Sequence, residues 1–527
     1  MQQIFADRHP DGCTFMDCEL VKEKRFGFRS QMVYRCKKCE KVTTLDTDKV
    51  GESEMPANKG AVSGVLAAGG TYTMLSSATA GLNMPCMDRK TWQRHEEDVA
   101  DNIEAAALEA MLEAGREEYR LAVEAGDVDA DGVPFITVIA DGMWSKRTYG
   151  SKYDAKSGTA TIIGFRTGKV LWTSTMNKVC AVCAWAAKAG RAPRRHTCAK
   201  NYSGPSTGME AAIIAEGFKC SMEMHGLRFD KLVGDGDSSV TSRLLQIKPY
   251  GALYLVEKVE CKNHLLRNFR RQLDALANNT HLPIPEGVTK QEMVHLRKTI
   301  GNHAAQLSFG VSKASEHRGV DGEEGEWPGG AAPCSAHRGA LQYCFVPDVP
   351  TRERVQRLRG DILNAANHRF GEHSRCADYF CKYRDGAAAA GPADPADAPA
   401  GAAGHPAQPA RLLPSENYPE RLRKAGLWHH IMLILNRMAD KAGSLIYNVN
   451  NNPCEVFNGK IARNIGGKRV FLSRRRSFKT RCLAAAIDLN TSGQLQRTVH
   501  KKMHGASPGE PRGRARPRLP SCRRRRV

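Results

Sequence analysis

The feature that most restricts the fold is a series of short apolar runs between residues 133 and 277. Runs at 133–141, 160–165 and 169–175 are separated by Gly and Lys, which favours an antiparallel meander. A helical pattern, a strand, a helix, a strand and a basic helix follow, at 208–218, 229–233, 239–247, 252–259 and 264–277. We therefore expect an α/β fold built on a mixed five-stranded sheet.

Three carboxylates stand at informative places in this pattern. Asp141 ends the first strand, Asp235 follows the fourth, and Glu455 falls in a helical pattern after the Asn-rich turn 448–453. If the first and fourth strands are neighbours, the aspartates lie side by side and the late helix can add Glu455. Such a trio suits two divalent ions about 4 Å apart, and carboxylates are hard ligands for Mg²⁺ or Mn²⁺. Asp237 competes with Asp235, and an Asp after a strand often only caps a turn.

Positive charge is concentrated at the C-terminal end. The chain has 78 Lys and Arg against 56 Asp and Glu, but residues 411–527 hold 26 against 6. This excess predicts a polyanion partner, nucleic acid before an acidic membrane surface. The candidate DNA contacts are Arg267, Arg270, Arg271, Lys468, Arg469, Arg474, Arg475 and Arg476, with Lys460, Arg463, Lys479 and Arg481 in the same basic run. A merely soluble basic surface is the alternative.

The chain gives no sign of a membrane segment. The uncharged stretch 60–87 consists largely of Gly, Ala, Ser and Thr, whereas a spanning helix needs about 20 mostly apolar residues. The N-terminus has no apolar signal core. We expect an intracellular protein with reduced cysteines, and the Arg-rich tail 512–526 favours the nucleus.

Cysteines grouped with histidines predict zinc. The strongest candidate is Cys180-x-x-Cys183 followed by His196-x-Cys198, two close pairs that suit tetrahedral Zn²⁺. Weaker candidates are an N-terminal set and a set in the later half of the chain: Cys13, Cys18, Cys36 and Cys39; and His368, His373, Cys376 and Cys381. Packed or surface thiols are the alternative for each.

Several short motifs together resemble a known family. They are Ala-Asp-Gly-Met-Trp-Ser-Lys-Arg at 140–147, Gly-Asp-Gly-Asp-Ser-Ser-Val at 234–240, Glu-Cys-Lys-Asn-His-Leu-Leu-Arg-Asn at 260–268, Asn-Asn-Pro-Cys-Glu-Val-Phe-Asn at 451–458 and Gly-Gly-Lys-Arg at 466–469. Their order and composition are similar to the Mutator-like (MULE-type) DNA transposase domain, in the variant common in animal DNA transposons.

The resemblance implies a ribonuclease-H-like core, an Asp-Asp-Glu triad and an α-helical insertion before the Glu. The triad maps onto Asp141, Asp235 and Glu455. Cys261-x-x-His264 resembles a signature that shapes the core beside the active site, the alternative being a packed thiol and a helix cap. The implied activity is metal-dependent cleavage of double-stranded DNA at transposon ends, then strand transfer by the freed 3′-hydroxyl into target DNA. A homo-oligomer is expected, because such enzymes pair two DNA ends.

The expected domain plan has six parts. They are an N-terminal zinc ribbon (1–50), a small-residue segment and helical lead-in (51–130), the first part of the core (131–285, with a zinc-like module at 177–201), an insertion (286–448, with low-complexity loops at 318–339 and 386–410), a final core helix carrying the catalytic Glu (449–490), and a basic disordered tail (491–527).

Two other functions fit parts of the pattern. A catalytically decayed or domesticated copy would still bind DNA and zinc without cutting, and the unusual tract 386–410 and the Pro- and Arg-rich tail leave room for it. A ribonuclease-H-like nuclease acting on RNA or hybrids would use the same carboxylates. The presence of all three carboxylates favours an active enzyme.

Overall fold

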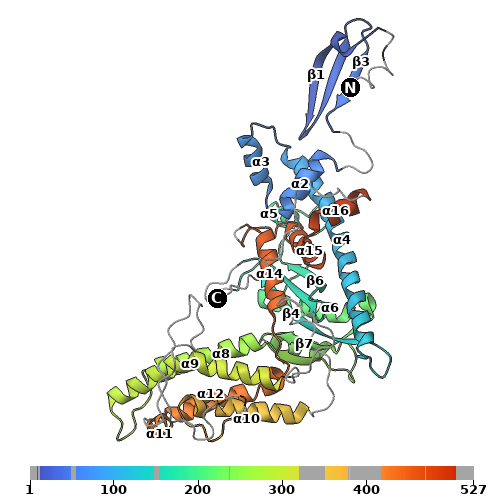
Figure 1. The fold of residues 1–527 in the computed structure, drawn as a ribbon. Coiled ribbons are helices and arrows are strands. Elements are labelled where there is room, and N and C mark those ends of the chain that lie inside the picture. The colour runs from blue at the N-terminus through green and yellow to red at the C-terminus, as the bar shows by residue number, and fades with distance from the viewer. Residues whose placement is uncertain are drawn as a thin grey trace, which may run out of the picture.

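The computed structural model describes residues 9, 12–48, 55–146, 153–236, 238–319, 351–377, 379, 381, 417–468 and 470–505. A small N-terminal sheet, a central sheet flanked by helices, and a helical bundle follow one another along the long axis (Figure 1). The predicted loops 318–339 and 386–410 lie almost entirely outside the described residues, as do Asp237, Arg469 and the chain after residue 505. No described helix combines the length and apolar character needed to span a bilayer.

The N-terminal sheet is a three-stranded antiparallel meander. A short 3-10 helix, η1 (Phe15–Asp17), precedes β1 (Cys18–Phe26), β2 (Arg29–Cys36) and β3 (Val42–Asp46). The β1–β2 turn is tied to the next helix, because the Asn58 side chain accepts from Phe28 N (2.8 Å) and donates to Phe26 O (2.7 Å). Gly27 in this turn has φ 70°, and a Cβ there would lie 2.5 Å from Asn58 Oδ1. Only glycine satisfies both constraints.

The small-residue segment folds into helices rather than an irregular linker. These are α2 (Ala57–Ala67) and α3 (Tyr72–Gly81), followed by the long α4 (Arg89–Glu124). Asp88 caps α4 by accepting from the backbone N–H groups of Lys90 and Thr91. Val62 and Leu66 of α2 are buried with Val99 and Ile103 of α4, so small side chains here allow close helix packing.

The prediction of disorder from residue 491 is wrong for its first part. After α15 (Ser477–Asn490), α16 covers Leu495–His504. Leu495 and Val499 stand one turn apart, are buried, and join the cluster of Val62 and Val99. Two apolar residues in a strongly basic stretch are enough to dock this helix, whereas the net charge alone suggested a solvated tail.

The central sheet has five strands in the order β6-β5-β4-β7-β8. They are β4 (Phe135–Trp144), β5 (Ser157–Gly164), β6 (Val170–Asn177), β7 (Arg228–Gly234) and β8 (Glu257–Glu260). The first three pair antiparallel, whereas β4–β7 and β7–β8 are parallel. The mixed five-stranded α/β prediction is confirmed, including adjacent first and fourth strands. The last strand is shorter than the predicted 252–259.

Helices cover both faces of this sheet. On one face, η2 (Ser206–Gly208) leads into α6 (Met209–His225), and α7 (Ser238–Ile247) follows β7. Residues of α6 and α7 are buried there with Val138 and Ala140 of β4. On the other face, α14 (Asn452–Asn464) and α15 pack on Ile139, Met143 and Val233. The final core segment is thus two helices rather than one.

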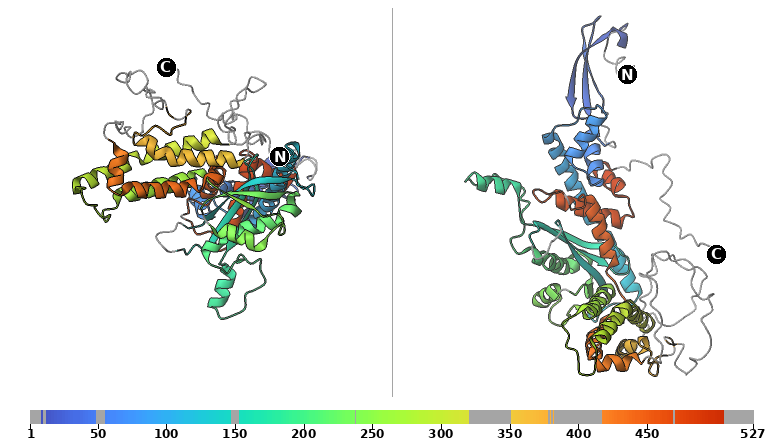
Figure 2. Two further views of the ribbon diagram at one scale, coloured as in Figure 1. Left: turned by 90° about the horizontal axis from the view of Figure 1, so that it is seen from below. Right: turned by 90° about the vertical axis from the view of Figure 1, so that its left-hand side faces the viewer.

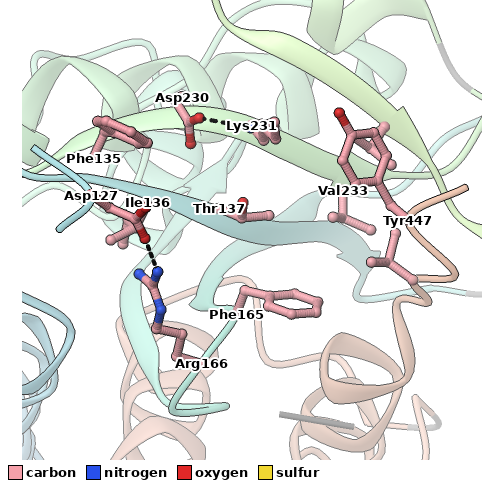
Figure 3. Close-up of a pocket in the computed structure, with 12 residues that line it drawn as sticks. Asp127, Phe135, Ile136, Thr137, Phe165, Arg166, Asp230, Lys231, Val233 and Tyr447 are labelled. Carbon is pink, nitrogen blue, oxygen red and sulfur yellow. Dashed lines mark hydrogen bonds and ion pairs between the residues drawn. The ribbon is translucent and has the colours of Figure 1, made fainter. Parts of the chain in front are cut away.

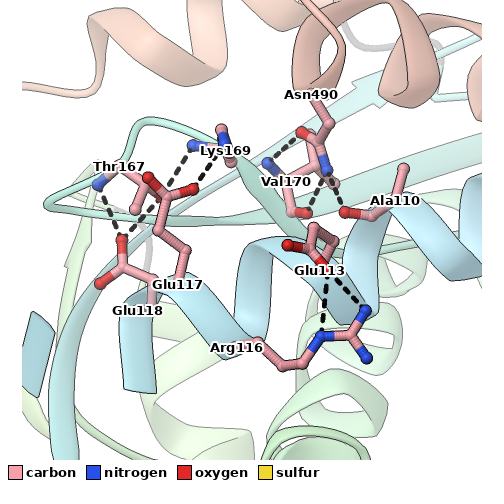
Figure 4. A network of polar contacts seen from close by, with 9 residues as sticks. All are labelled: Ala110, Glu113, Arg116, Glu117, Glu118, Thr167, Lys169, Val170 and Asn490. Atoms are coloured by element: carbon pink, nitrogen blue, oxygen red, sulfur yellow. Dashed lines mark hydrogen bonds and ion pairs between the residues drawn. The ribbon is translucent and has the colours of Figure 1, made fainter. Parts of the chain in front are cut away.

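A polar network ties α4 and the end of α15 to the β5–β6 hairpin (Figure 4). Asn490 donates to the carbonyls of Ala110 (3.0 Å) and Val170 (2.9 Å) and accepts from Val170 N (2.8 Å). Glu118 accepts from both Thr167 N and its hydroxyl at 2.8 Å. Burial raises the pKa of Glu118 despite these bonds. These contacts fix the helices that cover the site.

The expected insertion, 286–448, folds into a helical bundle that also includes α8 (Lys262–Asn278), so the boundary expected at residue 285 is wrong. The bundle comprises α8, α9 (Lys290–Arg318), α10 (Thr351–Arg369), α11 (Tyr418–Lys424), α12 (Leu427–Ala439) and α13 (Ala442–Leu445). One apolar cluster fills it, with Phe269, Leu296, Ile362 and Leu435 each at most 2% exposed. The bundle lies at the opposite end of the central sheet from the N-terminal sheet (Figure 1). It therefore has a core of its own beside the central sheet.

A small module stands out from the sheet after β6. It contains α5 (Ala181–Lys188) and the loop that follows, and it projects from the body in both views of Figure 2. Only Ala186 of α5 is buried. The module therefore has little apolar core to hold it.

Candidate active site

Asp141, within β4, and Asp235, directly after β7, stand side by side on two parallel strands. The expectation that Asp141 ends the first strand is wrong, because β4 continues to Trp144 as the partner of β5. Ile139 pairs with Val233 between β4 and β7, and each aspartate comes two residues later. Because side chains alternate along a strand, both aspartates share the face of Ile139 and Val233. That is the face on which α14 packs. Hydrophobic patterning alone therefore positions the two carboxylates toward α14.

The helix α14 brings Glu455 to the same place. Asn458, on the next turn, donates from Nδ2 to Oδ2 of Asp141 at 2.9 Å. Cys454 is buried and its thiol donates to the Ile139 carbonyl at 3.6 Å. Residues three apart lie on one face of a helix, so Glu455 and Asn458 both face Asp141. Glu455 and Asp235 are both near enough for their charges to act on Asp141.

Electrostatics give the same picture. Burial, together with the negative charges of Asp235 and Glu455, raises the pKa of Asp141 to about 6, against the Gly142 N–H and the Asn458 amide. A partly buried carboxyl beside two others is destabilised as an anion. A bound divalent cation would relieve this repulsion. Asp237 lies outside the described residues, so the choice between Asp235 and Asp237 for the second position stays a prediction.

Cys261 links the two halves of the site. Its backbone N–H donates to the carbonyl of Gly234 (2.8 Å), next to Asp235. Its thiol donates to Oδ1 of the buried Asn451 at 3.2 Å, at the start of α14. Lys262 N donates to Val449 O (2.9 Å). Cys261 therefore holds the β7 end against the start of the Glu455 helix, whereas His264 sits in the first turn of α8 with Nδ1 buried and unpartnered among the described residues.

One carboxylate near the site was missed in the sequence. Glu210, in the first turn of α6, faces Gly142 closely enough that a Cβ on Gly142 would lie 2.6 Å from its Cδ. The charge of Glu210 also acts on the Cys454 thiol, after burial and Asp141. An acidic residue in a helix's first turn is ordinary, so no sequence signal distinguished it.

The cluster of Cys180, Cys183, His196 and Cys198 has the geometry of a metal site. Nε2 of His196 lies 3.3 Å from Cys180 Sγ and 3.4 Å from Cys183 Sγ, and Cys183 and Cys198 Sγ are 3.6 Å apart. Around a tetrahedral zinc with Zn–S near 2.3 Å, ligand atoms are about 3.5–3.8 Å apart. Although burial opposes it, backbone N–H groups, led by that of Cys183, lower the pKa of Cys180 to about 6. This cluster is compatible with Zn²⁺.

The N-terminal cluster differs from the predicted one by a single ligand. His9, Cys13, Cys36 and Cys39 converge, their ligand atoms all within 4.8 Å of one another. Cys18 begins β1 opposite Cys36, and its thiol donates to the Thr14 carbonyl instead. His9 reaches Cys39 Sγ at 3.3 Å. The predicted Cys18 ligand is therefore replaced by His9, which sequence spacing did not single out.

The third predicted cluster also converges. His368, His373, Cys376 and Cys381 place their ligand atoms within 4.8 Å of one another. Nδ1 of His368 lies 3.3 Å from Cys376 Sγ, and Nδ1 of His373 lies 3.4 Å from Cys381 Sγ. Burial lowers the pKa of His368 to about 4, which keeps the imidazole neutral, as a metal ligand must be. Among the described residues, the carboxylate trio does not converge this tightly.

The candidate DNA-binding cations have unequal surroundings. Arg267, Arg270 and Arg271 are exposed on α8, and Arg270 has only a 3.9 Å pair with Asp274. Arg474 and Arg475 are exposed, whereas Arg476 is held by Asp101 (2.6 Å) and Glu104 (2.8 Å) of α4. Lys468 is half-buried at φ 65°, and Arg469 lies outside the described residues.

Arg481 does not belong with these cations. Its side chain is 2% exposed and donates to the backbone carbonyls of Asn464 (2.6 Å), Leu66 (3.5 Å) and Gly70. It joins α15 to the end of α14 and to the α2–α3 connection. The prediction that it contacts DNA is wrong, because composition does not distinguish a buried arginine from an exposed one.

A separate apolar pocket lies at the other end of the sheet (Figure 3). Phe135, Ile136 and Thr137 line it at the start of β4, with Tyr447 and an ion pair between Arg166 and Asp127. Asp141 is near the opposite end of the same strand. The pocket therefore lies apart from the carboxylates, and its residues suggest no chemistry.

Comparison with known proteins identifies the family. Searches of curated proteins and of solved structures gave no match. The family model of the Mutator-like transposase matches residues 1–318, more than half of the chain. The matched range contains Asp141, Asp235 and the Cys261-x-x-His264 signature, and it ends before Glu455. The family accounts for a transposase function with nuclease and DNA-binding activity, and the chain belongs to the Mutator-like transposases.

Proposed function

We propose that this protein is an Asp-Asp-Glu transposase with a ribonuclease-H-like core, which cleaves DNA at transposon ends and joins the freed 3′-hydroxyl to target DNA. The strand order, with three antiparallel strands followed by two parallel ones, supports the fold assignment. The helical bundle between β8 and α14 corresponds to the insertion expected before the third carboxylate.

One observation carries the proposal. Asn458, one turn after Glu455 on α14, donates to the Asp141 carboxylate at 2.9 Å, and the pairing of Ile139 with Val233 puts Asp235 on the neighbouring strand, so carboxylates from distant parts of the sequence are brought together. Burial and the charges of Asp235 and Glu455 raise the pKa of Asp141 to about 6. A partly buried carboxylate beside two others costs stability unless a function retains it. Divalent Mg²⁺ or Mn²⁺, when bound there, would activate the attacking oxygen and stabilise the leaving oxygen of a phosphodiester.

The residues have separate tasks in this scheme. Asp141, Asp235 and Glu455 would hold the ions, and Asn458 fixes the Asp141 carboxylate by its 2.9 Å hydrogen bond. Arg267, Arg270 and Arg271 on α8 follow Cys261 and would hold backbone phosphates near the strand ends. We also propose a homo-oligomer, since two DNA ends must meet, and nuclear action, since the tail 512–526 is Arg-rich.

The experiment is nicking of supercoiled DNA in Mg²⁺ or Mn²⁺, with DNA binding measured in parallel. Wild type, Asp141→Asn and Glu455→Gln are compared with two matched controls, Asp154→Asn and Glu353→Gln. Asp154 and Glu353 are exposed carboxylates paired with Lys146 and Arg357. Nicking lost only in the first two variants supports the proposal. DNA binding without nicking by wild type, even with terminal repeats supplied, indicates a decayed or domesticated copy. Cleavage confined to RNA or hybrids indicates a ribonuclease.

A further inference from the structure

The projecting module and the segment after α14 enclose a groove. Cys180, Arg194, Arg195 and Thr197 line one side, Arg474 and Arg475 line another, and the first turns of α4 close the third. The space is about 1290 Å³ and open to solvent. A second hollow shares Thr197, Ala199, Arg475 and Arg476 with it and continues along the end of β6. We call the first hollow the module groove.

The charge in the module groove is unevenly balanced. Glu96, Glu97 and Asp101 of α4 line it too. Asp101 is taken by Arg476 at 2.6 Å, Glu96 accepts from the Trp92 indole, and Glu97 lies 3.7 Å from Arg475. Arg194, Arg195 and Arg474 are exposed and make no ion pair with any described residue. Arginines without an ion pair to a described residue, on two segments that line the same groove, suit a phosphate backbone.

Both walls are attached directly to the metal cluster. His196 donates from Nδ1 to the carbonyl of Arg194 at 2.7 Å, which leaves Nε2 free to face the thiols of Cys180 and Cys183. On the other side, Ala181 N donates to the carbonyl of Arg474 at 3.0 Å. The candidate ligand His196, and Ala181 next to the candidate ligand Cys180, therefore hold the two arginine-bearing segments.

Asn177, the last residue of β6, reinforces this attachment. Its Nδ2 donates to the carbonyls of Ser473 (2.7 Å), Val179 (2.9 Å) and Ala199 (3.0 Å). The module itself offers little apolar burial, since Ala186 alone is buried in α5. A small unit without a core usually needs a metal to fold.

The module groove lies at the same end of the sheet's strands as the carboxylates. Asp141 pairs with Thr161 and Thr161 with Thr173, so Asn177 is four residues beyond the level of Asp141 and two strands away. At about 4.8 Å between strands and 3.3 Å per residue, Asn177 lies roughly 10 Å from Asp141 across the strands and roughly 13 Å along them. A duplex in the groove would pass within one helical turn of Asp141.

We propose that the cluster of Cys180, Cys183, His196 and Cys198 and the segment Ser473–Arg476 form a single DNA-backbone site, whose two arginine walls are assembled by the bound metal. The occupant is double-stranded DNA, held by phosphate contacts without base reading. The inference takes DNA as the partner from the proposed function, and it assumes no step of the proposed chemistry.

The test measures binding of a random-sequence duplex by fluorescence anisotropy between about 50 and 300 mM salt. Over this range, the affinity of a protein that contacts phosphates falls steeply with salt concentration. The variants are Arg194→Ala with Arg195→Ala, and Arg474→Ala with Arg475→Ala. Arg116→Ala with Arg120→Ala is the matched control, because these arginines are exposed on α4 away from the groove. Each groove pair should weaken binding roughly 10-fold and reduce the salt slope by about 2. The control should change neither.

Metal dependence is measured on the same duplex. Zinc removal by a chelator should weaken DNA binding as much as the loss of both arginine pairs together. Cys198→Ser, at the exposed ligand, should do the same. Added Zn²⁺ should restore DNA binding by the chelated wild type. Circular dichroism checks that the rest of the chain stays folded. Groove variants that bind like the control, or a zinc-free protein with the full salt slope, would overturn the inference.

The outcome is distinguishable from failure of the proposed function. Asp141→Asn should bind the random duplex with the wild-type affinity and salt slope and fail to nick, so the binding data test the groove separately from the chemistry. If Asp141→Asn nicks like wild type, the proposed chemistry fails while the groove stands on its binding data.

Discussion

The side-chain amide of Asn458 donates a 2.9 Å hydrogen bond to the carboxylate of Asp141, across 317 residues of sequence. It joins the last core helix to the first core strand at the centre of the proposed site. The other carboxylate oxygen of Asp141 accepts from Gly142 N at 2.8 Å, so the docking of α14 completes the hydrogen bonding of this carboxylate and the proposed site needs both ends of the core.

Removing this bond should impair metal binding more than folding. In Asn458→Ala the Asp141 carboxylate loses a donor that lowers its pKa. Outer-shell partners of metal ligands typically contribute 10–100-fold, so we expect nicking roughly 10–100-fold slower. The acid limb of the pH–rate profile should also move to higher pH. An unchanged profile with a slower rate would mean that Asn458 acts only on helix packing.

The metal-free protein should be stabilised by Asp141→Asn. The folded pKa of Asp141 is about 6, above its ordinary 3.8, so the folded state favours the protonated form. Stability from this group is complete below pH 4 and is lost as pH rises from about 4 to 6. The variant should therefore gain about 1–3 kcal/mol at pH 7 and little at pH 4. Chemical denaturation at the two pH values measures this, and a gain independent of pH would contradict the assigned burial.

Gly142→Ala should displace Glu210. The added Cβ would lie 2.6 Å from Cδ of Glu210, so we expect a loss of about 1–3 kcal/mol, as for overpacking. Removing the obstacle in Gly142→Ala/Glu210→Ala should recover much of it, as a double-mutant cycle would show. Additive effects of the two substitutions would contradict the close approach. Nicking by Glu210→Ala alone shows separately whether this carboxylate contributes to the chemistry.

The N-terminal zinc site distinguishes His9 from Cys18. Three clusters converge in the described chain, so the purified protein should contain three zinc atoms by mass spectrometry of the metal. His9→Ala should lose about one of them, because the ligand number falls below four. Cys18→Ser should lose none, since that thiol faces the Thr14 carbonyl. The reverse result would restore the ligand set expected from spacing.

The strands and Asp141 and Asp235 could be predicted because apolar periodicity is local. The apolar runs at 133–140 and 229–233 predict buried strands. Each aspartate follows its run in the sequence, so its position at the C-terminal side of the strand could be predicted too. Glu455 became a candidate through the helical pattern after the Asn-rich turn 448–453, and the family resemblance then gave it the third position of the triad.

Other features depend on tertiary contacts. His9 joins Cys36 and Cys39 only through the register of β1 and β2. Glu210 matters only because Gly142 has no side chain. Arg481 and Arg474 stand in one basic run, yet one is buried among carbonyls and the other is exposed. A count of charges does not predict which arginine is buried, because the burial of Arg481 depends on how α2, α14 and α15 pack together.

The most direct test of the central claim replaces a proposed metal-bound oxygen by sulfur. Asp141→Cys should fold, bind DNA normally and fail to nick in Mg²⁺, because thiolates are poor ligands for this hard ion. In Mn²⁺, which accepts softer ligands, nicking should partly return, while Asp141→Ala stays inactive in both metals. Equal nicking by Asp141→Cys and wild type in Mg²⁺ would show that Asp141 does not hold the catalytic metal.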